Sequence, residues 1–174
     1  MQSVRYTRTA RLLHWFTAVA IVAAFVLARS LAGLQLSPHK IHLINYHKWI
    51  GLTVLWLSIV RIWWRVQHRP PRLPTSLSSW ERSAAAATHT ALYVLMAATP
   101  LLGWWLSSAM GFSLKYLGVI RLPDLGPKDK TAAQWIEPIH AAFAWTLLTL
   151  ALVHALAALR HQVICRDNIL RRII

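Results

Sequence analysis

The stretch that decides the fold is Pro138–Leu159, with the sequence PIHAAFAWTLLTLALVHALAAL. Its 22 residues contain no Asp, Glu, Lys or Arg. As an α-helix it would cover about 33 Å, and a bilayer core is about 30 Å thick, so it predicts a membrane-spanning helix. Two histidines, His140 and His154, lie fourteen residues apart within it. Fourteen helical residues fall about 40° short of four turns, so both imidazoles lie on nearly one face, about 21 Å apart.

Three further apolar stretches precede this one. The predicted spans are roughly 10–29, 44–66, 85–107 and 135–160. They predict an all-α fold, an integral membrane four-helix bundle that forms a single domain over residues 1–174. Pro100 is a candidate site for a kink in the third span. Three links are predicted between the spans: a polar stretch from Arg29 to Asn45, a proline-rich segment at 69–74 and a longer loop at 111–133. A basic tail at 165–174 follows the fourth span and could lie in the membrane interface.

The composition favours a membrane protein over a soluble one. It is 56% hydrophobic with ten tryptophans, which fit the interfacial belts of membrane proteins. The net charge of +14 comes from basic residues that flank the apolar stretches, so we interpret it as topology signals and lipid contacts rather than a nucleic-acid surface. Cys165 is the single cysteine, which excludes an internal disulfide and a C-x-x-C-H haem-attachment motif. The N-terminal apolar stretch has no obvious cleavage site after it and is expected to remain as the first helix.

The distribution of basic residues predicts the orientation. Four spans place both termini on one side of the membrane. The N-terminus, the second link with the end of the second span, and the tail together hold twelve Lys and Arg, whereas the first and third links hold seven. Because basic residues are enriched on the cytoplasmic side, both termini are predicted to be cytoplasmic.

Five histidines fall within the predicted spans, at depths that pair them. His47 and His140 are near the outer face, whereas His154 is near the inner face and could pair with either His14 or His89. Ionisable residues inside a membrane mark functional sites by default, and neutral imidazole is a common axial ligand of haem iron. Two histidines on one iron leave no open position, which favours electron transfer. Hydrogen bonds between helices are the alternative interpretation.

Small and basic residues near the histidines have two interpretations each. Gly51 lies one turn after His47, and Gly103 lies fourteen residues after His89, so either glycine could make room for a flat cofactor or for close helix packing. Arg61, fourteen residues after His47, could bind a haem propionate or extend to lipid headgroups. Arg65 is expected to be a surface anchor.

The ordered set of motifs resembles the bacterial cytochrome b561 family over nearly the whole chain. The matching pieces, in chain order, are Tyr6-Thr7-Arg8 with Leu13-His14-Trp15; His47-Lys48-Trp49-Ile50-Gly51 with Arg61-Ile62-Trp63-Trp64-Arg65; Thr88-His89 with Tyr93 and Pro100-Leu101-Leu102-Gly103; and His140 and His154 with Arg166-Asp167-Asn168 and Leu170. The segment 111–133 matches none of these motifs.

The resemblance implies two non-covalent haem b groups in a bacterial inner membrane. By its pattern His14 and His154 would ligate the inner haem and His47 and His140 the outer one, which leaves His89 for a second-shell or quinone contact. The family exchanges electrons with the quinone pool, here ubiquinone, and some members are described as oxidising superoxide at the periplasmic face. Four lysines expected at that face could steer an anion, namely Lys40, Lys115, Lys128 and Lys130.

The leading functional prediction is a di-haem membrane oxidoreductase whose partners are lipid, quinone and superoxide or a redox protein. His89 and His161 are candidate quinone contacts, although a headgroup-level position is the favoured interpretation of His161. The alternative is a haem-bearing membrane anchor subunit of a larger dehydrogenase or hydrogenase, which would receive electrons from an iron–sulfur partner. A haem-free transporter or scaffold is the third class, and it would show no visible absorption.

Overall fold

The computed structural model describes residues 5–71 and 77–174 of the chain. Within these residues the chain forms four long helices, α1 Arg8–Leu31, α2 Pro38–Gln67, α3 Ser79–Ala109 and α4 Lys130–Arg160. Each is long and apolar enough to cross a membrane. The predicted all-α membrane bundle is therefore confirmed. Of the predicted proline-rich link, residues 72–74 lie outside the described residues.

The second helix begins earlier than predicted. The stretch Arg29–Asn45 was expected to be a polar link, but α1 continues to Leu31 and α2 starts at Pro38. The side chain of Ser37 accepts a hydrogen bond from the Lys40 amide, and proline occupies the first turn, where its missing N–H costs no hydrogen bond. Three polar residues at the start of α2, His39, Lys40 and His42, therefore belong to a helix.

The third and fourth helices also extend beyond their predicted spans. α3 begins at Ser79 because Ser78 and Glu81 form a capping box, in which each side chain bonds the other residue's backbone N–H. α4 begins at Lys130 because the Asp129 side chain accepts from the amides of Thr131 and Ala132. Both helices continue through an internal proline, Pro100 in α3 and Pro138 in α4.

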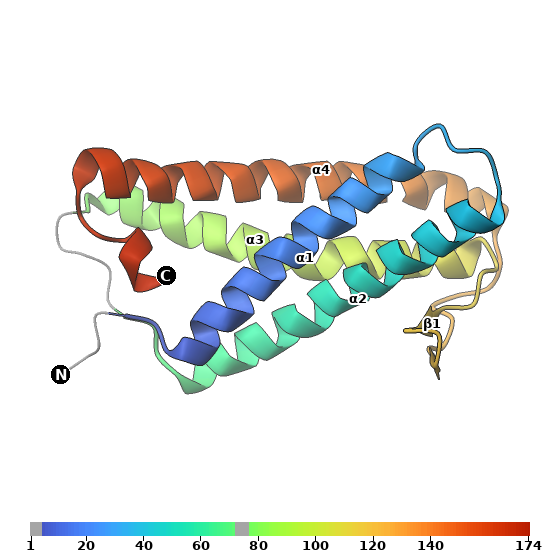
Figure 1. Cartoon of the computed structure of the whole chain (residues 1–174), viewed down its shortest axis with the longest axis horizontal. Coiled ribbons are helices and arrows are strands. Elements are labelled where there is room, and N and C mark those ends of the chain that lie inside the picture. The colour runs from blue at the N-terminus through green and yellow to red at the C-terminus, as the bar shows by residue number, and fades with distance from the viewer. Residues whose placement is uncertain (1–4, 72–76) are drawn as a thin grey trace.

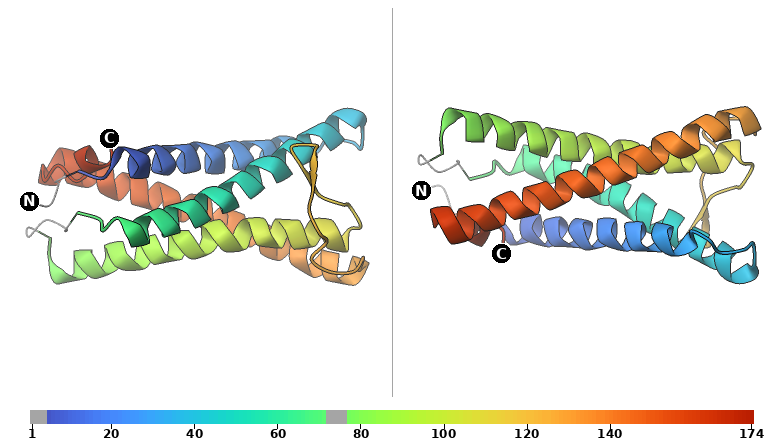
Figure 2. Two further views of the ribbon diagram at one scale, coloured as in Figure 1. Left: turned by 90° about the horizontal axis from the view of Figure 1, so that it is seen from below. Right: turned by 90° about the horizontal axis from the view of Figure 1, so that it is seen from above.

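The four helices run along one long axis (Figures 1 and 2). α1 packs mainly on α2, α3 packs on α4, and α2 joins the two pairs, whereas α1 and α4 make little contact. The start of α1 and the C-terminus lie at one end of the bundle, which we call the terminal end. The α1–α2 loop lies at the other, the hairpin end.

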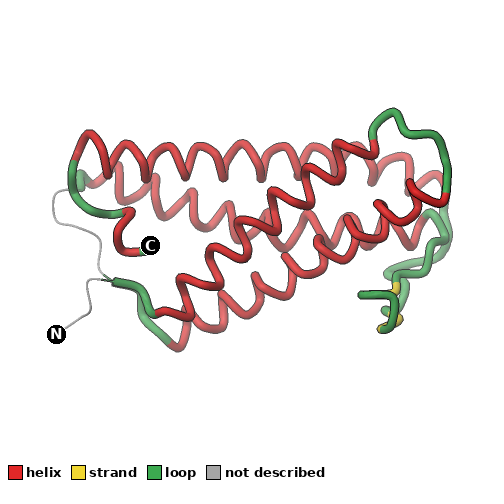
Figure 3. The backbone as a smooth tube through the Cα atoms, viewed as in Figure 1, coloured by secondary structure: helices red, strands yellow, loops and turns green. Residues whose placement is uncertain are grey.

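The segment predicted as a loop at 111–133 contains a short hairpin and the first turn of α4. β1 (Lys115–Tyr116) pairs antiparallel with β2 (Ile120–Arg121), as the yellow segments of Figure 3 show. Trp49 Nε1 donates to the Lys115 carbonyl at 2.6 Å, and the Tyr116 hydroxyl bonds Thr53 Oγ1 at 2.9 Å. These contacts fasten the hairpin to α2.

The C-terminal tail folds back onto the start of α1. It forms a π-helical turn, η1 (His161–Cys165), and a 3₁₀ turn, η2 (Leu170–Arg172). Tyr6 N donates to the Arg172 carbonyl at 3.0 Å, and Trp15 Nε1 donates to the Ile173 carbonyl at 3.1 Å. The tail, expected at the membrane interface, is therefore also a packed part of the terminal end.

Candidate functional site

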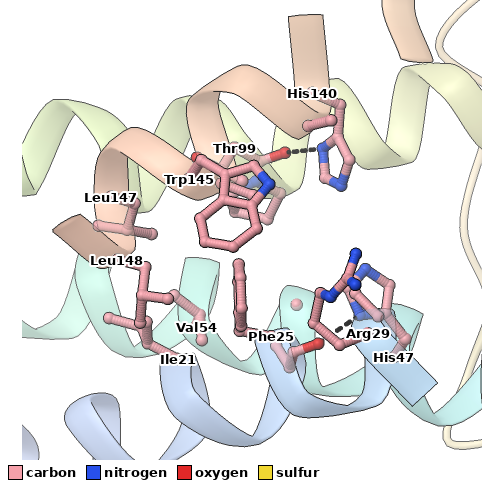
Figure 4. Close-up of a pocket in the computed structure, with 16 residues that line it drawn as sticks. Ile21, Phe25, Arg29, His47, Val54, Thr99, His140, Trp145, Leu147 and Leu148 are labelled. Carbon is pink, nitrogen blue, oxygen red and sulfur yellow. Dashed lines mark hydrogen bonds between the residues drawn. The ribbon is translucent and has the colours of Figure 1, made fainter. Parts of the chain in front are cut away.

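The hairpin-end pair consists of His47 from α2 and His140 from α4. Their ring centroids are 6.3 Å apart and their planes are nearly perpendicular, at 87°. His47 Nδ1 lies 2.9 Å from the Ala24 carbonyl, and His140 Nδ1 lies 3.0 Å from the Thr99 carbonyl (Figure 4). A carbonyl oxygen only accepts, so each Nδ1 carries the proton and donates it. Each Nε2 is then the unprotonated nitrogen that a metal can bind.

The separation of this pair suits a metal ion between the rings. Metal–imidazole bonds of about 2.0–2.1 Å place two opposed coordinating nitrogens about 4 Å apart and the ring centres roughly 6 Å apart. The observed 6.3 Å between centroids agrees with that separation of ring centres. Hydrogen bonds from the other ring nitrogen to carbonyl groups are the usual support for a metal-binding histidine.

A cavity of about 240 Å³ adjoins the hairpin-end pair and is lined by all four helices. Apolar side chains dominate its wall, and Arg29 lies at its edge beside His47 (Figure 4). Phe25 of α1 and Trp145 of α4 meet edge to face across the space, with centroids 4.7 Å apart. Thr99 Oγ1 is buried without a hydrogen-bond partner among the described residues. The wall therefore offers an apolar surface, one cation and one unused polar atom, which fits a flat apolar group that carries carboxylates.

The two glycines singled out in the sequence have different surroundings. Gly51 lines the cavity, and a Cβ added there would meet no atom within 4 Å, so space lies above it. Gly103 packs directly against the His140 ring, because an added Cβ would lie 2.9 Å from its Cε1. Gly103 therefore makes room for an imidazole, whereas Gly51 faces the cavity.

The terminal-end cluster brings together His14 of α1, His89 of α3 and His154 of α4. The ring centroids of His14 and His154 are 6.3 Å apart, the same separation as in the hairpin-end pair. The centroids of His89 and His154 are only 5.2 Å apart. The structure thus brings His154 near both candidate partners, but only the His14 pair has the spacing that suits an intervening metal.

Arg61 of α2 lies within the terminal-end cluster. One guanidinium nitrogen lies 3.3 Å from His14 Nδ1, the other lies 3.8 Å from Met96 Sδ, and the group sits 5.4 Å from the Tyr93 ring centroid. No carboxylate of the described residues pairs with it. A half-buried guanidinium in a membrane bundle needs an anionic partner, so this position suits a ligand carboxylate. Arg65, by contrast, is exposed.

The other predicted site residues lie at the two ends. His161 lies in η1, and its Nδ1 hydrogen-bonds Asp167 Oδ2. Four lysines lie at the hairpin end on separate elements, namely Lys40 in α2, Lys115 in β1, Lys128 before α4 and Lys130 at its start. Their spread forms a basic rim rather than one cluster.

Sequence reasoning missed three contributors to the hairpin-end site. Arg29 was assigned to a link but lies in the last turn of α1 and lines the cavity. Arg29 follows the N-terminal arginines by about the length of one membrane-spanning helix, and this spacing could have indicated that it belongs to the end of the first helix. The carbonyl groups of Ala24 and Thr99 left no signal, because any residue type supplies a backbone carbonyl.

A sequence profile described as prokaryotic cytochrome b561 matches residues 5–174. The chain belongs to the prokaryotic cytochrome b561 family. Cytochrome b561 homolog 2 of Escherichia coli is 29% identical over 98% of this chain and 91% of its own length. Cytochrome b561 homolog 1 of the same organism is 30% identical over 97% and 96%. A Yersinia pestis protein named probable superoxide oxidase CybB is 24% identical over 92% and 90%.

Membership in the family gives this bundle its general role. It is a multi-pass bacterial membrane protein of a cytochrome family that binds b-type haem and transfers electrons within the membrane. The carbonyl-bonded imidazoles, the apolar cavity wall and the nearby cation are the features that such a group requires.

Proposed function

We propose that this cytochrome b561 family protein holds two b-type haems, one at each end of the bundle, and exchanges electrons with quinone. The observation that carries the proposal is the repeated 6.3 Å spacing of His47 with His140 and of His14 with His154. The shorter 5.2 Å contact of His89 with His154 favours His14 as the second inner ligand.

At the hairpin end, His47 and His140 would hold the iron through Nε2. The carbonyl groups of Ala24 and Thr99 fix the orientation of each ring and keep the proton on Nδ1. Arg29 is placed to bind a propionate, and Gly51 leaves room for the macrocycle. When bound, haem b supplies one-electron oxidation and reduction at its iron. Because two histidines would hold the iron and leave it no free coordination site, the group would supply electron transfer rather than oxygen binding.

At the terminal end, His14 and His154 would form the second ligand pair, with Arg61 as the partner of a propionate. Arg61 is already next to His14, and its charge is unmatched by any carboxylate of the described residues. His89 would then act as a neighbour of the ligand His154 or as a contact for quinone. His161 is the second candidate for contact with ubiquinone at this end.

The orientation that we propose places the terminal end in the cytoplasm, in the bacterial inner membrane. The excess of basic residues at that end supports it. The hairpin end would then face the periplasm, where the rim of lysines could attract a small anion. One relative is named a probable superoxide oxidase, so superoxide is the donor that we propose, with ubiquinone as the acceptor.

The test is a two-step spectroscopic experiment on the purified, haem-loaded protein. Superoxide generated enzymatically should reduce the haem iron, which is seen as the absorption spectrum of the reduced haem. Added superoxide dismutase should abolish this reduction. Anaerobic addition of decylubiquinone should then reoxidise the protein. Reduction that is insensitive to superoxide dismutase would overturn the proposed donor, and failure of decylubiquinone to reoxidise the protein would overturn the proposed acceptor.

A further inference from the structure

The turn of the β1–β2 hairpin carries an exposed apolar surface. Between Lys115 and Arg121 the chain reads Tyr-Leu-Gly-Val-Ile, without a charged residue. The side chains of Leu117, Val119 and Ile120 are 57%, 83% and 56% exposed, and we call these three residues the hairpin tip. An exposed apolar cluster of this kind marks a surface that contacts a membrane or another protein.

The other apolar residues of the same segment face the bundle. Leu114 is only 3% exposed and packs with Leu52 and Leu55 of α2. Tyr116 and Leu122 pack against the same cluster. The core thus covers one apolar side of this segment, and the hairpin tip is a second apolar side that the described part of the chain leaves uncovered.

The backbone of the turn accepts an unfavourable residue at the hairpin tip. Val119 N donates to the Tyr116 carbonyl at 3.1 Å, which closes the turn. The two residues between them, Leu117 and Gly118, have positive φ values of 52° and 76°. Two consecutive positive φ values in a hairpin turn are typical of Asn-Gly and Asp-Gly. Leucine is disfavoured there because its Cβ crowds the following carbonyl oxygen, so packing within the protein does not account for an apolar residue at this position.

The hairpin lies outside the four helices, beside the first half of α2 (Figures 1 and 2). Trp49 Nε1 donates to the Lys115 carbonyl, and a Cβ added at Gly118 would lie 3.8 Å from Trp49 Cζ2. Trp49 lies five residues inside the predicted span 44–66, which corresponds to about 7.5 Å along the helix. Interfacial segments bury their apolar side about 5–10 Å into the boundary between headgroups and acyl chains. The hairpin is therefore at the level where such insertion occurs.

The charges at the base of the hairpin tip suit a phospholipid. Lys115 and Arg121 are directly opposite each other in the two strands, and like charges in that position destabilise a sheet. No carboxylate of the described residues forms an ion pair with either. Lipid phosphates would supply the missing negative charge, while the acyl chains would cover the apolar side chains beyond the two cations.

We propose that the hairpin tip inserts into the lipid leaflet at the hairpin end of the bundle, with Lys115 and Arg121 at the level of the phospholipid phosphates. The link 111–133 is then in part a membrane-embedded segment. Because Trp49 and Thr53 fasten the hairpin to α2, the insertion fixes the depth of the hairpin end in the membrane. This inference is independent of haem, quinone and superoxide, because it rests only on the hairpin and the spanning helices.

The experiment measures the depth of a nitroxide spin label in the haem-loaded, full-length protein. The label is attached to V119C in a C165S background, because Cys165 is the single cysteine and is exposed. The protein is reconstituted in vesicles of phosphatidylethanolamine and phosphatidylglycerol. Power-saturation electron paramagnetic resonance then compares collisions with oxygen, which concentrates in lipid, and with a water-soluble nickel chelate. We expect oxygen to reach the label at position 119 more often than the nickel chelate does.

Two reference positions calibrate the result. D124C labels an exposed residue of the same link and should favour the nickel chelate. V94C labels α3, where Val94 is 58% exposed within the predicted span 85–107, and should favour oxygen most strongly. The label at position 119 should fall between the two.

A charge reversal tests the contact with phosphate. In R121E, the glutamate would pair with Lys115 across the strands and preserve the hairpin, but it would repel lipid phosphates. We expect the ratio of oxygen to nickel collisions at position 119 to fall in R121E. The matched control R121K keeps the positive charge and should leave the ratio unchanged.

Each outcome decides the proposal. A label at position 119 that favours the nickel chelate as D124C does would place the hairpin tip in water and overturn the insertion. Low access to both reagents would mean that protein covers the tip, for example a second copy of the chain, and would also overturn it. An unchanged ratio in R121E would overturn the contact of Arg121 with phosphate. If V119C cannot be reconstituted with haem, I120C decides in its place.

Discussion

Replacement of Gly103 by alanine tests whether His140 is held where an iron ligand must be. The new methyl carbon would lie 2.9 Å from Cε1 of His140, 3.4 Å from Nδ1 and 3.6 Å from Nε2. Non-bonded carbons prefer about 3.5–4.0 Å, so the ring or α3 must move by about 0.6 Å or more. The ring cannot tilt freely, because Nδ1 is bonded to the Thr99 carbonyl at 3.0 Å.

A displacement of that size matters because metal–ligand distances tolerate only about 0.2 Å. Disturbing the support of a metal ligand typically costs about 10–100-fold in affinity. The fold itself should survive, since alanine is favoured over glycine within a helix by about 1 kcal/mol. We therefore expect G103A to retain its helices and its terminal-end haem and to bind the hairpin-end haem about 10–100-fold more weakly.

The assay is a haem titration of detergent-purified protein, followed by reduced-minus-oxidised spectra. The matched control is G126A, because a Cβ at Gly126 would meet Trp105 at an ordinary 3.5 Å, away from the histidines. G126A should bind haem as the wild type does. Wild-type affinity at both sites in G103A would refute the argument that this glycine sets the position of His140.

Three further predictions concern the two ends of the bundle. In R61Q, the missing guanidinium should weaken haem binding at the terminal end about tenfold or more and leave the hairpin-end site unchanged in the same titration; equal loss at both sites would contradict a local role. W15F removes the hydrogen bond that Trp15 Nε1 donates to the Ile173 carbonyl. We therefore expect carboxypeptidase to trim the tail faster and the free energy of unfolding to fall by about 1 kcal/mol. Unchanged digestion would show that this bond does not hold the tail. Neutralising the four rim lysines to glutamine should lower the rate of superoxide-dependent haem reduction and its sensitivity to salt, and an unaltered rate would exclude electrostatic steering by Lys40, Lys115, Lys128 and Lys130.

The sequence was sufficient to predict the bundle and the pairing of His47 with His140. The 3.6-residue repeat of an α-helix predicted that His140 and His154 share one face. The positions of His47 and His140 within their apolar spans predicted that the two lie at the same level of the bundle, and their rings do lie together. The helix starts were predicted too late, although Ser37-Pro38 and the Ser78–Glu81 capping box were visible in the sequence. Hydropathy marks the apolar length of a span, whereas polar capping residues mark where the helix begins.

Other features depended on contacts that sequence cannot supply. Depth alone left His14 and His89 as equal partners for His154. The family resemblance favoured His14, and the ring separations of 6.3 Å for His14 and 5.2 Å for His89 support that choice. The hairpin at 115–121 is fixed by Trp49 and Thr53, which lie more than sixty residues earlier. The contact between His161 and Asp167 depends on two left-handed residues and a π-helical turn, which no periodic pattern announces.

The most direct test of the account is a haem count per chain in purified wild-type protein and in single alanine variants of the five histidines. The account predicts about two haems in the wild type, about one in H47A, H140A, H14A and H154A, and about two in H89A. A wild-type count of one, or loss of a haem in H89A with retention in H14A, would contradict the proposed pair of sites.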